Sequence, residues 1–296
     1  MQRTKTYSVI AGLTRNPLVQ AYRRGSRVKP GMTQLESRAR RPRHAAYRDE
    51  IHYSEKDGIF LLEFRGVSKY YGKFAAVADA SFTAEAGLVY GLVGYNGAGK
   101  TTLLKTAAGV FKPERGAVLA SGVDVFDNAA YHREMFLLPD EPYFPPQASL
   151  DTLRRVYRGY YPGWSDKTYK KLRELFRLDG KAKISGFSKG MQRQAAILIA
   201  LATHPKYLIM DEAFDGLDLS KRTLMKSLLR EYAQAKGAVL LVSSHNLSEL
   251  EKLADRVGVL RDRVLTLDAP VSELPVSLEE LFSEESGSDY DFNEIF

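Results

Sequence analysis

The chain has 296 residues, a net charge of +7, 44% hydrophobic and 27% charged residues, and no cysteine. This length and composition suit a globular protein with one large domain or two modest ones, and they exclude disulfides, thiol nucleophiles and cysteine-ligated metals. The longest uncharged apolar run, residues 195–202, is 8 residues long, whereas a membrane-spanning helix needs about 20.

The chain begins with a basic head, which we assign to residues 1–57. Residues 1–50 hold 12 Lys and Arg against 3 Asp and Glu. Arg is mixed with Pro, Gly, Ser and Thr without helical or strand periodicity, so the head can bury too little apolar surface to become ordered. The alternatives are a transit peptide, a membrane-surface arm, or a start assigned too far upstream.

Beyond the head, from near Ile59, predicted strands alternate with predicted helices. Strands are expected at residues 59–64, 77–82, 88–93, 207–210 and 238–242. Helices are expected at residues 100–108, 150–178 with a break at 161–163, 189–203, 220–237 (N-cap Ser220, stop Gly237) and 247–254. The alternation predicts an α/β fold with a mainly parallel sheet, into which a helical block at about 145–203 is inserted.

The chain ends with a short strand after Val264 and an acidic tail, which we assign to residues 270–296. Residues 264–296 hold 9 Asp and Glu and no Lys or Arg. This charge cancels the basic head, so the surplus of +7 belongs to the middle of the chain. Charged ends are most often solvated segments, and the net charge therefore does not by itself indicate nucleic-acid binding.

Residues 94–101, Gly-Tyr-Asn-Gly-Ala-Gly-Lys-Thr, match the phosphate-binding pattern G-x-x-x-x-G-K-S/T between a predicted strand and a predicted helix. Glycines let successive N–H groups point at phosphate oxygens, and the helix N-terminus adds partial positive charge. Lys100 brings a full charge to the β and γ phosphates, and the Thr101 hydroxyl suits Mg²⁺. The alternative is a glycine-rich turn with an exposed lysine. The expected binding residues are Gly94, Tyr95, Asn96, Gly97, Ala98, Gly99, Lys100, Thr101 and Thr102.

Two carboxylates end the apolar run at residues 207–210. Parallel strands place ligand-facing groups at their carboxyl ends, so Asp211 suits Mg²⁺ and Glu212 suits the general base that polarises the attacking water. The alternative is a solvated turn. His245 follows another strand-like run. It is either a surface residue or, if that strand neighbours the acid pair, a contact of the γ-phosphate or the attacking water.

These motifs, in this order, resemble the ATP-binding subunit of ABC transporters over residues 59–267. Tyr71 looks like the aromatic residue that stacks on adenine. Residues 187–191, Phe-Ser-Lys-Gly-Met, stand where the family has its signature L-S-G-G-Q. Residues 215–218 look like the D-loop, which makes Asp218 a nucleotide contact, and His245 looks like the switch histidine.

The resemblance implies a head-to-tail dimer in which ATP is clamped between one subunit's phosphate loop and the other's signature. Ser188, Lys189, Gly190 and Met191 would then meet ATP of the partner, because Gly190 permits a close backbone approach and the following helix presents its N-terminus. The resemblance also implies ATP and Mg²⁺ as cofactors. The implied fold, at residues 58–269, is a P-loop core with a mainly parallel sheet, an antiparallel β part on its N-terminal side and an inserted α-helical subdomain.

Some residues depart from the family pattern. Asp140 stands where a glutamine is expected; it keeps an oxygen for Mg²⁺ or water but donates no hydrogen bond. Lys189 replaces a glycine, Met191 a glutamine and Ala213 a proline. The acidic Asp140 and the S-K-G-M signature look like the branch that serves two-component exporters with separate membrane subunits.

We therefore expect an ATPase that powers export through a separate transmembrane permease. It would sit peripherally at the cytoplasmic face of the cell membrane beside a second ATP-binding subunit, identical or different, with no specific nucleic acid. One alternative is a soluble ABC-type ATPase acting on nucleic acid or ribosomes, although the chain has one phosphate loop and no sustained heptads. Another is a non-hydrolysing regulatory partner, against which Lys100, Asp211 and Glu212 argue.

Overall fold

The computed structural model describes residues 60–283. The predicted basic head at 1–57 and the last part of the predicted tail, 284–296, lie outside the described residues. The strands are β1 (Leu61–Tyr71), β2 (Phe74–Glu85), β3 (Val89–Gly94), β4 (Arg115–Ala120), β5 (Val123–Asp124), β6 (Met135–Leu138), β7 (Tyr207–Met210), β8 (Val239–Ser243), β9 (Arg256–Arg261) and β10 (Val264–Pro270). The helices are α3 (Lys100–Ala107), α4 (Ala129–Glu134), α5 (Leu150–Tyr160), α6 (Asp166–Leu175), α7 (Lys189–Ala202), α8 (Leu219–Lys236), α9 (Leu247–Glu251) and α10 (Leu278–Ser283), with 3-10 turns η2 (Ile184–Gly186) and η3 (Val271–Glu273).

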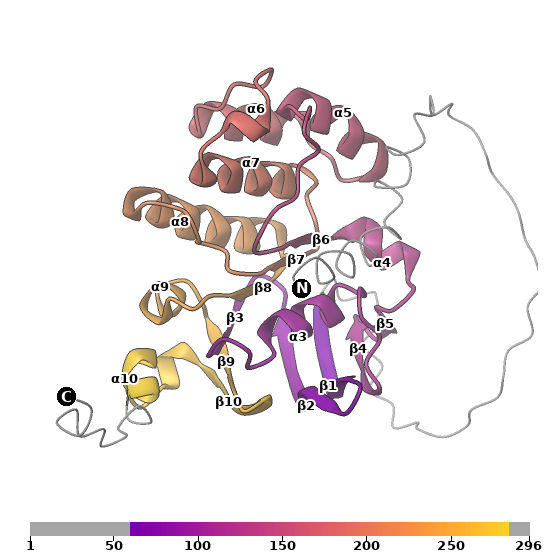
Figure 1. Cartoon of the computed structure of the whole chain (residues 1–296), viewed down its shortest axis with the longest axis vertical. Coiled ribbons are helices and arrows are strands. Elements are labelled where there is room, and N and C mark those ends of the chain that lie inside the picture. The colour runs from indigo at the N-terminus through magenta and orange to yellow at the C-terminus, as the bar shows by residue number, and fades with distance from the viewer. Residues whose placement is uncertain (1–59, 284–296) are drawn as a thin grey trace, which may run out of the picture. The chain divides into compact units, whose positions relative to one another are not determined.

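The strands form one mixed sheet in the order β5-β4-β1-β2-β10-β9-β3-β8-β7-β6 (Figure 1). One end of the sheet is antiparallel, because β1 pairs with β2 and β4, and β4 pairs with β5. The other end, β9-β3-β8-β7-β6, is parallel throughout. This confirms the predicted α/β fold with a parallel core and an antiparallel part on the N-terminal side.

The parallel strands carry the sequence pattern expected for strands covered on both faces. Every residue of β3, β7 and β8 is buried, which explains why these strands are continuous apolar runs without polar alternation. β8 lies between β3 and β7. The carboxyl ends of these three strands therefore lie next to one another, and parallel sheets bind ligands at this edge.

A group of three helices lies between β6 and β7 in the chain, namely α5, α6 and α7. α6 and α5 both pack on α7, and α7 packs on β6. Figure 1 shows the three stacked above the parallel strands, on the far side from β1 and β2. α7 thus connects this helical layer to the sheet. No helix within residues 60–283 is both long enough and apolar enough to cross a membrane.

Several local predictions were wrong. The N-cap of α8 is Asp218, not Ser220: the Asp218 carboxylate accepts from the backbone N–H of Lys221 at 2.9 Å, and the Ser220 hydroxyl donates to the same carboxylate at 2.7 Å. α8 does end before Gly237, which adopts the left-handed conformation with φ 57. The helix expected at 247–254 is only α9. The chain also forms β4, β5, β6, β9, α4 and α10, which the sequence pattern had not indicated.

Candidate functional site

The phosphate loop, residues 94–101, runs from the end of β3 into the first turn of α3. Its glycines are required by their surroundings: a Cβ at Gly94 would lie 2.6 Å from the carbonyl oxygen of Leu260, and one at Gly99 (φ 105) would clash with the carbonyl of Ala76. Gly99 is the residue before α3 and makes no side-chain cap, so the first N–H groups of α3 have no capping oxygen. A phosphate is the ligand that such a cradle favours.

Lys100 is buried, with 6% of its side chain exposed. Its ammonium donates to the loop's own carbonyls, those of Gly94 at 2.6 Å and Tyr95 at 3.3 Å, and lies 4.0 Å from Glu212 Oε1. Burial lowers the pKa of Lys100, and the charges of Glu212 and Asp211 oppose that shift. A partly desolvated cation inside the loop is suited to attract a phosphate group.

Asp211 and Glu212 directly follow β7, and both contact one hydroxyl of the neighbouring strand β8, Asp211 through its carboxylate and Glu212 through its backbone N–H. The Ser243 Oγ donates to Asp211 Oδ1 at 2.7 Å and accepts from the backbone N–H of Glu212 at 3.0 Å. Ser243 is fully buried, and Asp211 is 4% exposed. Sequence reasoning missed Ser243; the only signal was its place at the carboxyl end of a strand predicted to lie near the acid pair.

Glu212 and His245 are hydrogen-bonded to each other. The backbone N–H of His245 lies 2.9 Å and its Nδ1 lies 2.8 Å from Glu212 Oε2. Glu212 itself has φ 48, a left-handed conformation that is uncommon for a residue with a side chain. The proposed general base is thus held in a strained backbone conformation with one carboxylate oxygen bound to the histidine and the other near Lys100.

Arg193, in the second turn of α7, is a further residue that sequence reasoning missed. Its guanidinium donates to the backbone carbonyls of Pro139 at 2.9 Å, Asp140 at 2.8 Å and Glu212 at 2.7 Å. The only sequence signal was a charged residue in a predicted helix that is otherwise largely apolar. The structure shows that this helix is almost entirely buried, and a buried arginine is expected to be paired.

Asp140 follows β6 and is half-exposed, with its Oδ1 at 3.6 Å from Arg193 Nη2. Partial burial raises the pKa of Asp140, the Arg193 charge lowers it, and the carboxylates of Asp211, Glu212 and Asp215 raise it further. An acidic side chain at this position therefore lies in a field of other carboxylates, which a cation between them would relieve.

The predicted signature residues begin α7. The Ser188 hydroxyl accepts from the backbone N–H of Met191 at 3.3 Å and is the N-cap of the helix. Ser188 and Lys189 are exposed, and Met191 packs partly against the core. Gly190 is buried, and a Cβ there would lie 2.8 Å from the carbonyl oxygen of Gly216. This glycine is therefore required for packing within the chain itself.

The remaining predicted site residues lie near the surface. Tyr71 ends β1 half-exposed, with its ring edge-on to Phe111. The Tyr95 hydroxyl donates to the carbonyl of Phe282 at 3.1 Å, which ties the phosphate loop to α10. Hydrogen bonds from the Lys221 N–H and the Ser220 hydroxyl, followed by the Lys221 ammonium, lower the pKa of Asp218 to about 2. Within the phosphate loop Gly94 and Ala98 are buried, whereas Tyr95, Asn96, Gly97, Gly99 and Thr101 are exposed or partly exposed, as is Thr102 in the following turn of α3.

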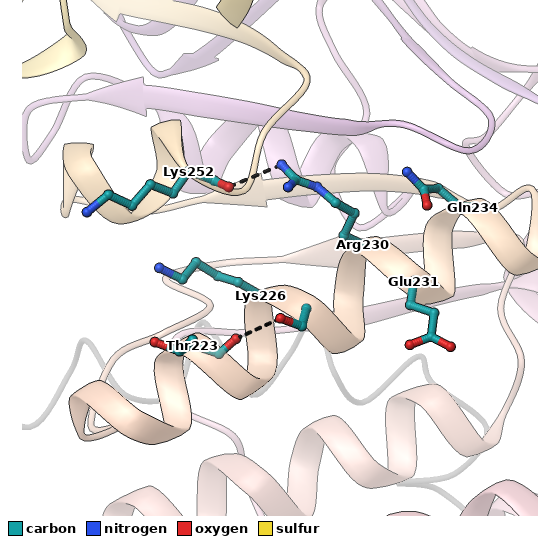
Figure 2. A pocket seen from close by; sticks show the side chains of 7 residues that line it. Thr223, Lys226, Arg230, Glu231, Gln234 and Lys252 are labelled. Atoms are coloured by element: carbon teal, nitrogen blue, oxygen red, sulfur yellow. Dashed lines mark hydrogen bonds between the residues drawn. The ribbon is translucent and has the colours of Figure 1, made fainter.

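A cavity of about 380 Å³ lies elsewhere, between α8 and α9 (Figure 2). It is lined by Thr223, Lys226, Ser227, Arg230, Glu231, Gln234 and Lys252. None of the predicted site residues lines it. Figure 2 shows the Arg230 guanidinium turned toward the backbone of Lys252, to which it donates at 3.1 Å, with a second bond to Leu253 at 2.8 Å. This cluster joins two helices and is separate from the phosphate loop.

Comparison with known proteins agrees with this geometry. Residues 77–215 match the family model described as ABC transporter. The Nod factor export ATP-binding protein I of Burkholderia lata is 35% identical over 208 residues, which are 68% of each chain. A structure described as the ATP binding subunit of an ABC transporter has a TM-score of 0.70 at 29% identity, covering 76% of this chain and 99% of that one. A dimeric cassette in a post-hydrolysis state with ADP and Pi, at 19% identity, shares the fold with a TM-score of 0.64, covering 71% and 98%.

Proposed function

The chain belongs to the ABC transporter family as an ATP-binding subunit and is an ATPase, and we propose that it powers export through a separate membrane permease. In this proposal it sits at the cytoplasmic face of the membrane, beside a second ATP-binding subunit. Export is supported by the export role named for the Burkholderia lata relative. The alternative, a soluble ATPase acting on nucleic acid or ribosomes, is not favoured by these relatives.

The observation that carries the mechanism is the meeting of three groups at the carboxyl ends of β3, β7 and β8. These groups are the Lys100 ammonium, the Asp211 carboxylate fixed by Ser243, and the Glu212 carboxylate fixed by His245. Phosphoryl transfer to water needs little covalent chemistry from the protein, so positioning and charge stabilisation supply the rate. These three groups supply both functions.

In the proposed mechanism, Lys100 exchanges its bonds to the Gly94 and Tyr95 carbonyls for phosphate oxygens of ATP. Glu212 accepts a proton from the attacking water as general base. His245 keeps the carboxylate of Glu212 oriented and contacts the γ-phosphate. Tyr71 stacks on the adenine ring. Stacking of this kind needs only an exposed aromatic face.

Mg²⁺ fits the donors at this site. It prefers oxygen ligands and is usually bound through one or two carboxylates, with phosphates and waters completing the octahedron. Asp211 offers a buried carboxylate with one oxygen taken by Ser243, Thr101 offers an exposed hydroxyl, and Asp140 offers a further carboxylate. Within residues 60–283 no three acidic or histidine side chains are grouped closely enough to hold a metal on their own. When bound, Mg²⁺ would neutralise charge on the transferred phosphate.

Copurification tests the export proposal. A tagged full-length chain, expressed in its own host and extracted with mild detergent, should bring down a multi-span membrane protein, and ATP hydrolysis by that complex should respond to reconstitution in vesicles. The Lys100→Ala variant should recover the same partner without hydrolysis. A wild-type chain that hydrolyses ATP but recovers only soluble or ribosomal partners would refute export while leaving the ATPase intact.

A further inference from the structure

Arg193 connects three parts of the site from a fully buried position. Its side chain is 3% exposed, and its guanidinium donates to carbonyls on two separate loops: Pro139 and Asp140 after β6, and Glu212 after β7. α7, which carries Arg193, begins at the exposed Ser188. Arg193 therefore links α7, the helix that begins at the signature, to two other parts of the site. These are the loop that carries Asp140 and the backbone of Glu212, the proposed general base.

The chemistry of arginine explains why it occupies this position. A guanidinium has five N–H donors in a rigid plane, so it can bind several carbonyls at once, whereas a lysine ammonium is a point charge on a flexible stem. Burying that charge is costly unless it is paired. Here burial lowers the pKa of Arg193, and the carboxylates of Asp140, Asp215, Asp211 and Glu212 oppose the shift. The surrounding acids keep the buried cation in place.

The strained backbone of Glu212 requires hydrogen bonds from its surroundings to hold it in place. Its φ of 48 is a conformation that persists only where the surroundings over-determine it. Its N–H is held by Ser243 and its carboxylate by His245. The carbonyl is held by Arg193 at 2.7 Å. The same guanidinium binds the loop at residues 139–140 and the Glu212 carbonyl, so a shift of that loop would disturb the contact that holds the Glu212 peptide.

We propose that Arg193 is a positioning residue that sets the orientation of Glu212 according to the placement of the loop at residues 139–140 and of the signature helix α7. This proposal rests on the proposed function, because it takes Glu212 as the general base. The hydrogen bonds of the Arg193 guanidinium go to the backbone carbonyls of Pro139, Asp140 and Glu212. Arg193 acts through the Glu212 backbone, and so it should affect the rate of the chemical step more than the binding of ATP.

The experiment measures steady-state phosphate release and, separately, the equilibrium binding of ATP in the full-length chain. Arg193→Lys keeps the positive charge but loses the planar set of N–H donors that binds several carbonyls at once. We expect kcat to fall roughly ten- to hundredfold, as for a misplaced catalytic group. The Kd for ATP should change by less than about threefold. Arg193→Ala should lose at least as much activity.

Arg230→Ala is the matched control. It removes another guanidinium that binds two backbone carbonyls, that of Lys252 (Figure 2) and that of Leu253, in a cluster away from the phosphate loop. Its kcat should stay within about twofold of wild type when compared at equal folded fraction. The melting temperatures of Arg193→Lys and Arg230→Ala are measured alongside. An equal loss of activity in both variants would show that the effect is general destabilisation and would overturn the proposal.

A double variant shows whether Arg193 acts through Glu212 or independently of it. In the Glu212→Gln background the added Arg193→Lys change should alter the residual rate by less than about twofold, because both changes act on the same carboxylate. Additive losses would refute action through Glu212. If the wild-type chain itself released no phosphate, the proposed function would fail; if it did and Arg193→Lys left kcat unchanged, only this inference would fail.

Discussion

Glu212 illustrates how neighbouring residues fix a single strained side chain. Its N–H, carbonyl and carboxylate are bound by Ser243, Arg193 and His245 respectively, which come from β8, α7 and the loop after β8. A non-glycine residue in a left-handed conformation costs about 1–3 kcal/mol. Three contacts from separate elements can offset that cost, and they fix the carboxylate before any substrate arrives.

Glu212→Gln tests the role of this carboxylate. The amide keeps an oxygen that accepts from the His245 N–H, so the fold and ATP binding should be preserved, whereas proton acceptance is lost. We expect phosphate release to fall at least about 100-fold, the ATP Kd to stay within a few-fold, and ATP to trap a dimer that light scattering detects. Glu231→Gln, at an exposed position of α8, is the control and should change neither quantity. Full turnover by Glu212→Gln would remove Glu212 from the chemistry.

The pH dependence of ATP binding should reveal the buried state of Lys100. Burial lowers its pKa in the free chain, and phosphate binds the protonated form. Affinity should therefore be constant below that pKa and fall by up to about tenfold per pH unit above it, beginning at a lower pH than an ordinary lysine would give. Titration of the ATP Kd between neutral and alkaline pH measures this. Lys100→Ala should bind ATP weakly and without this slope; parallel slopes in both proteins would assign the effect to another group.

The predictability of the site depended on whether its members are adjacent in sequence. Lys100 and the acid pair lie within short motifs whose residue types are dictated by phosphate and metal chemistry, so the printed sequence is sufficient to find them. Ser243 and Arg193 act through contacts with residues 32 and 19 positions away, respectively. Such contacts form only when β7 packs beside β8 and α7 packs on the sheet, and no local pattern records that packing.

At the scale of elements, α10 is the part of the chain whose role differs most from expectation. The described residues of the predicted acidic tail form η3 and α10. Leu278 and Phe282 are buried. The Leu278 N–H donates to Glu251 of α9 at 2.9 Å, and the Phe282 ring lies edge-on to that of Tyr95 at 5.1 Å. Two apolar side chains spaced four residues apart thus dock a charged helix next to the phosphate loop.

Phe282→Ala should release α10 from the phosphate loop. Truncating a buried phenylalanine costs about 3–5 kcal/mol in a core, and here the loss should appear as local opening because α10 packs against α9 and lies outside the sheet. Hydrogen exchange of the α10 amides should accelerate, and Tyr95→Phe should give a smaller effect of about 1 kcal/mol from the lost hydroxyl bond. Leu175→Ala, at an exposed position of α6, is the control. Unchanged exchange in Phe282→Ala would show that the ring does not anchor the helix.

Elements with strong patterns were predictable, and those defined by pairing were not. β7 matches its predicted bounds because a fully buried parallel strand is a continuous apolar run. β4, β5 and β9 are short or alternate weakly, and they exist because neighbouring strands complete their hydrogen bonds. Asp218, and not Ser220, is the N-cap of α8. An N-cap side chain accepts a hydrogen bond from the backbone N–H two or three residues later, and the Asp218 carboxylate accepts from that of Lys221.

At the scale of the whole molecule, the predicted ATP contacts divide into two groups. The phosphate loop and acid pair converge within the chain, whereas the side chains of Ser188 and Lys189 are exposed to solvent at the start of α7. The cassette with ADP and Pi, which shares this fold, is described as dimeric. In the proposed head-to-tail dimer, the signature of each chain contacts the phosphate loop of the other, so both motifs belong to one self-complementary interface with two equivalent sites.

Mixing two inactive variants tests that dimer. Ser188→Arg places a bulky side chain where the partner's phosphate loop would approach but leaves its own loop intact, and Lys100→Ala does the reverse. Each alone should release little phosphate. In a mixed pair, Lys100 of the first variant meets Ser188 of the second, which restores one complete site of two. Random pairing therefore allows up to about a quarter of the wild-type rate per chain.

The control for this mixture must account for the lost helix cap. Ser188 caps α7, so its replacement costs about 1 kcal/mol of stability whatever the site does. Ser149→Ala removes the corresponding cap of α5, where the hydroxyl accepts from Thr152 N–H at 3.2 Å, and should keep full activity. Recovery upon mixing requires that the signature act across the interface, because a site completed within one chain would leave both variants inactive in every pair. The absence of recovery, with dimers present by light scattering, would therefore assign Ser188 to its own chain's nucleotide.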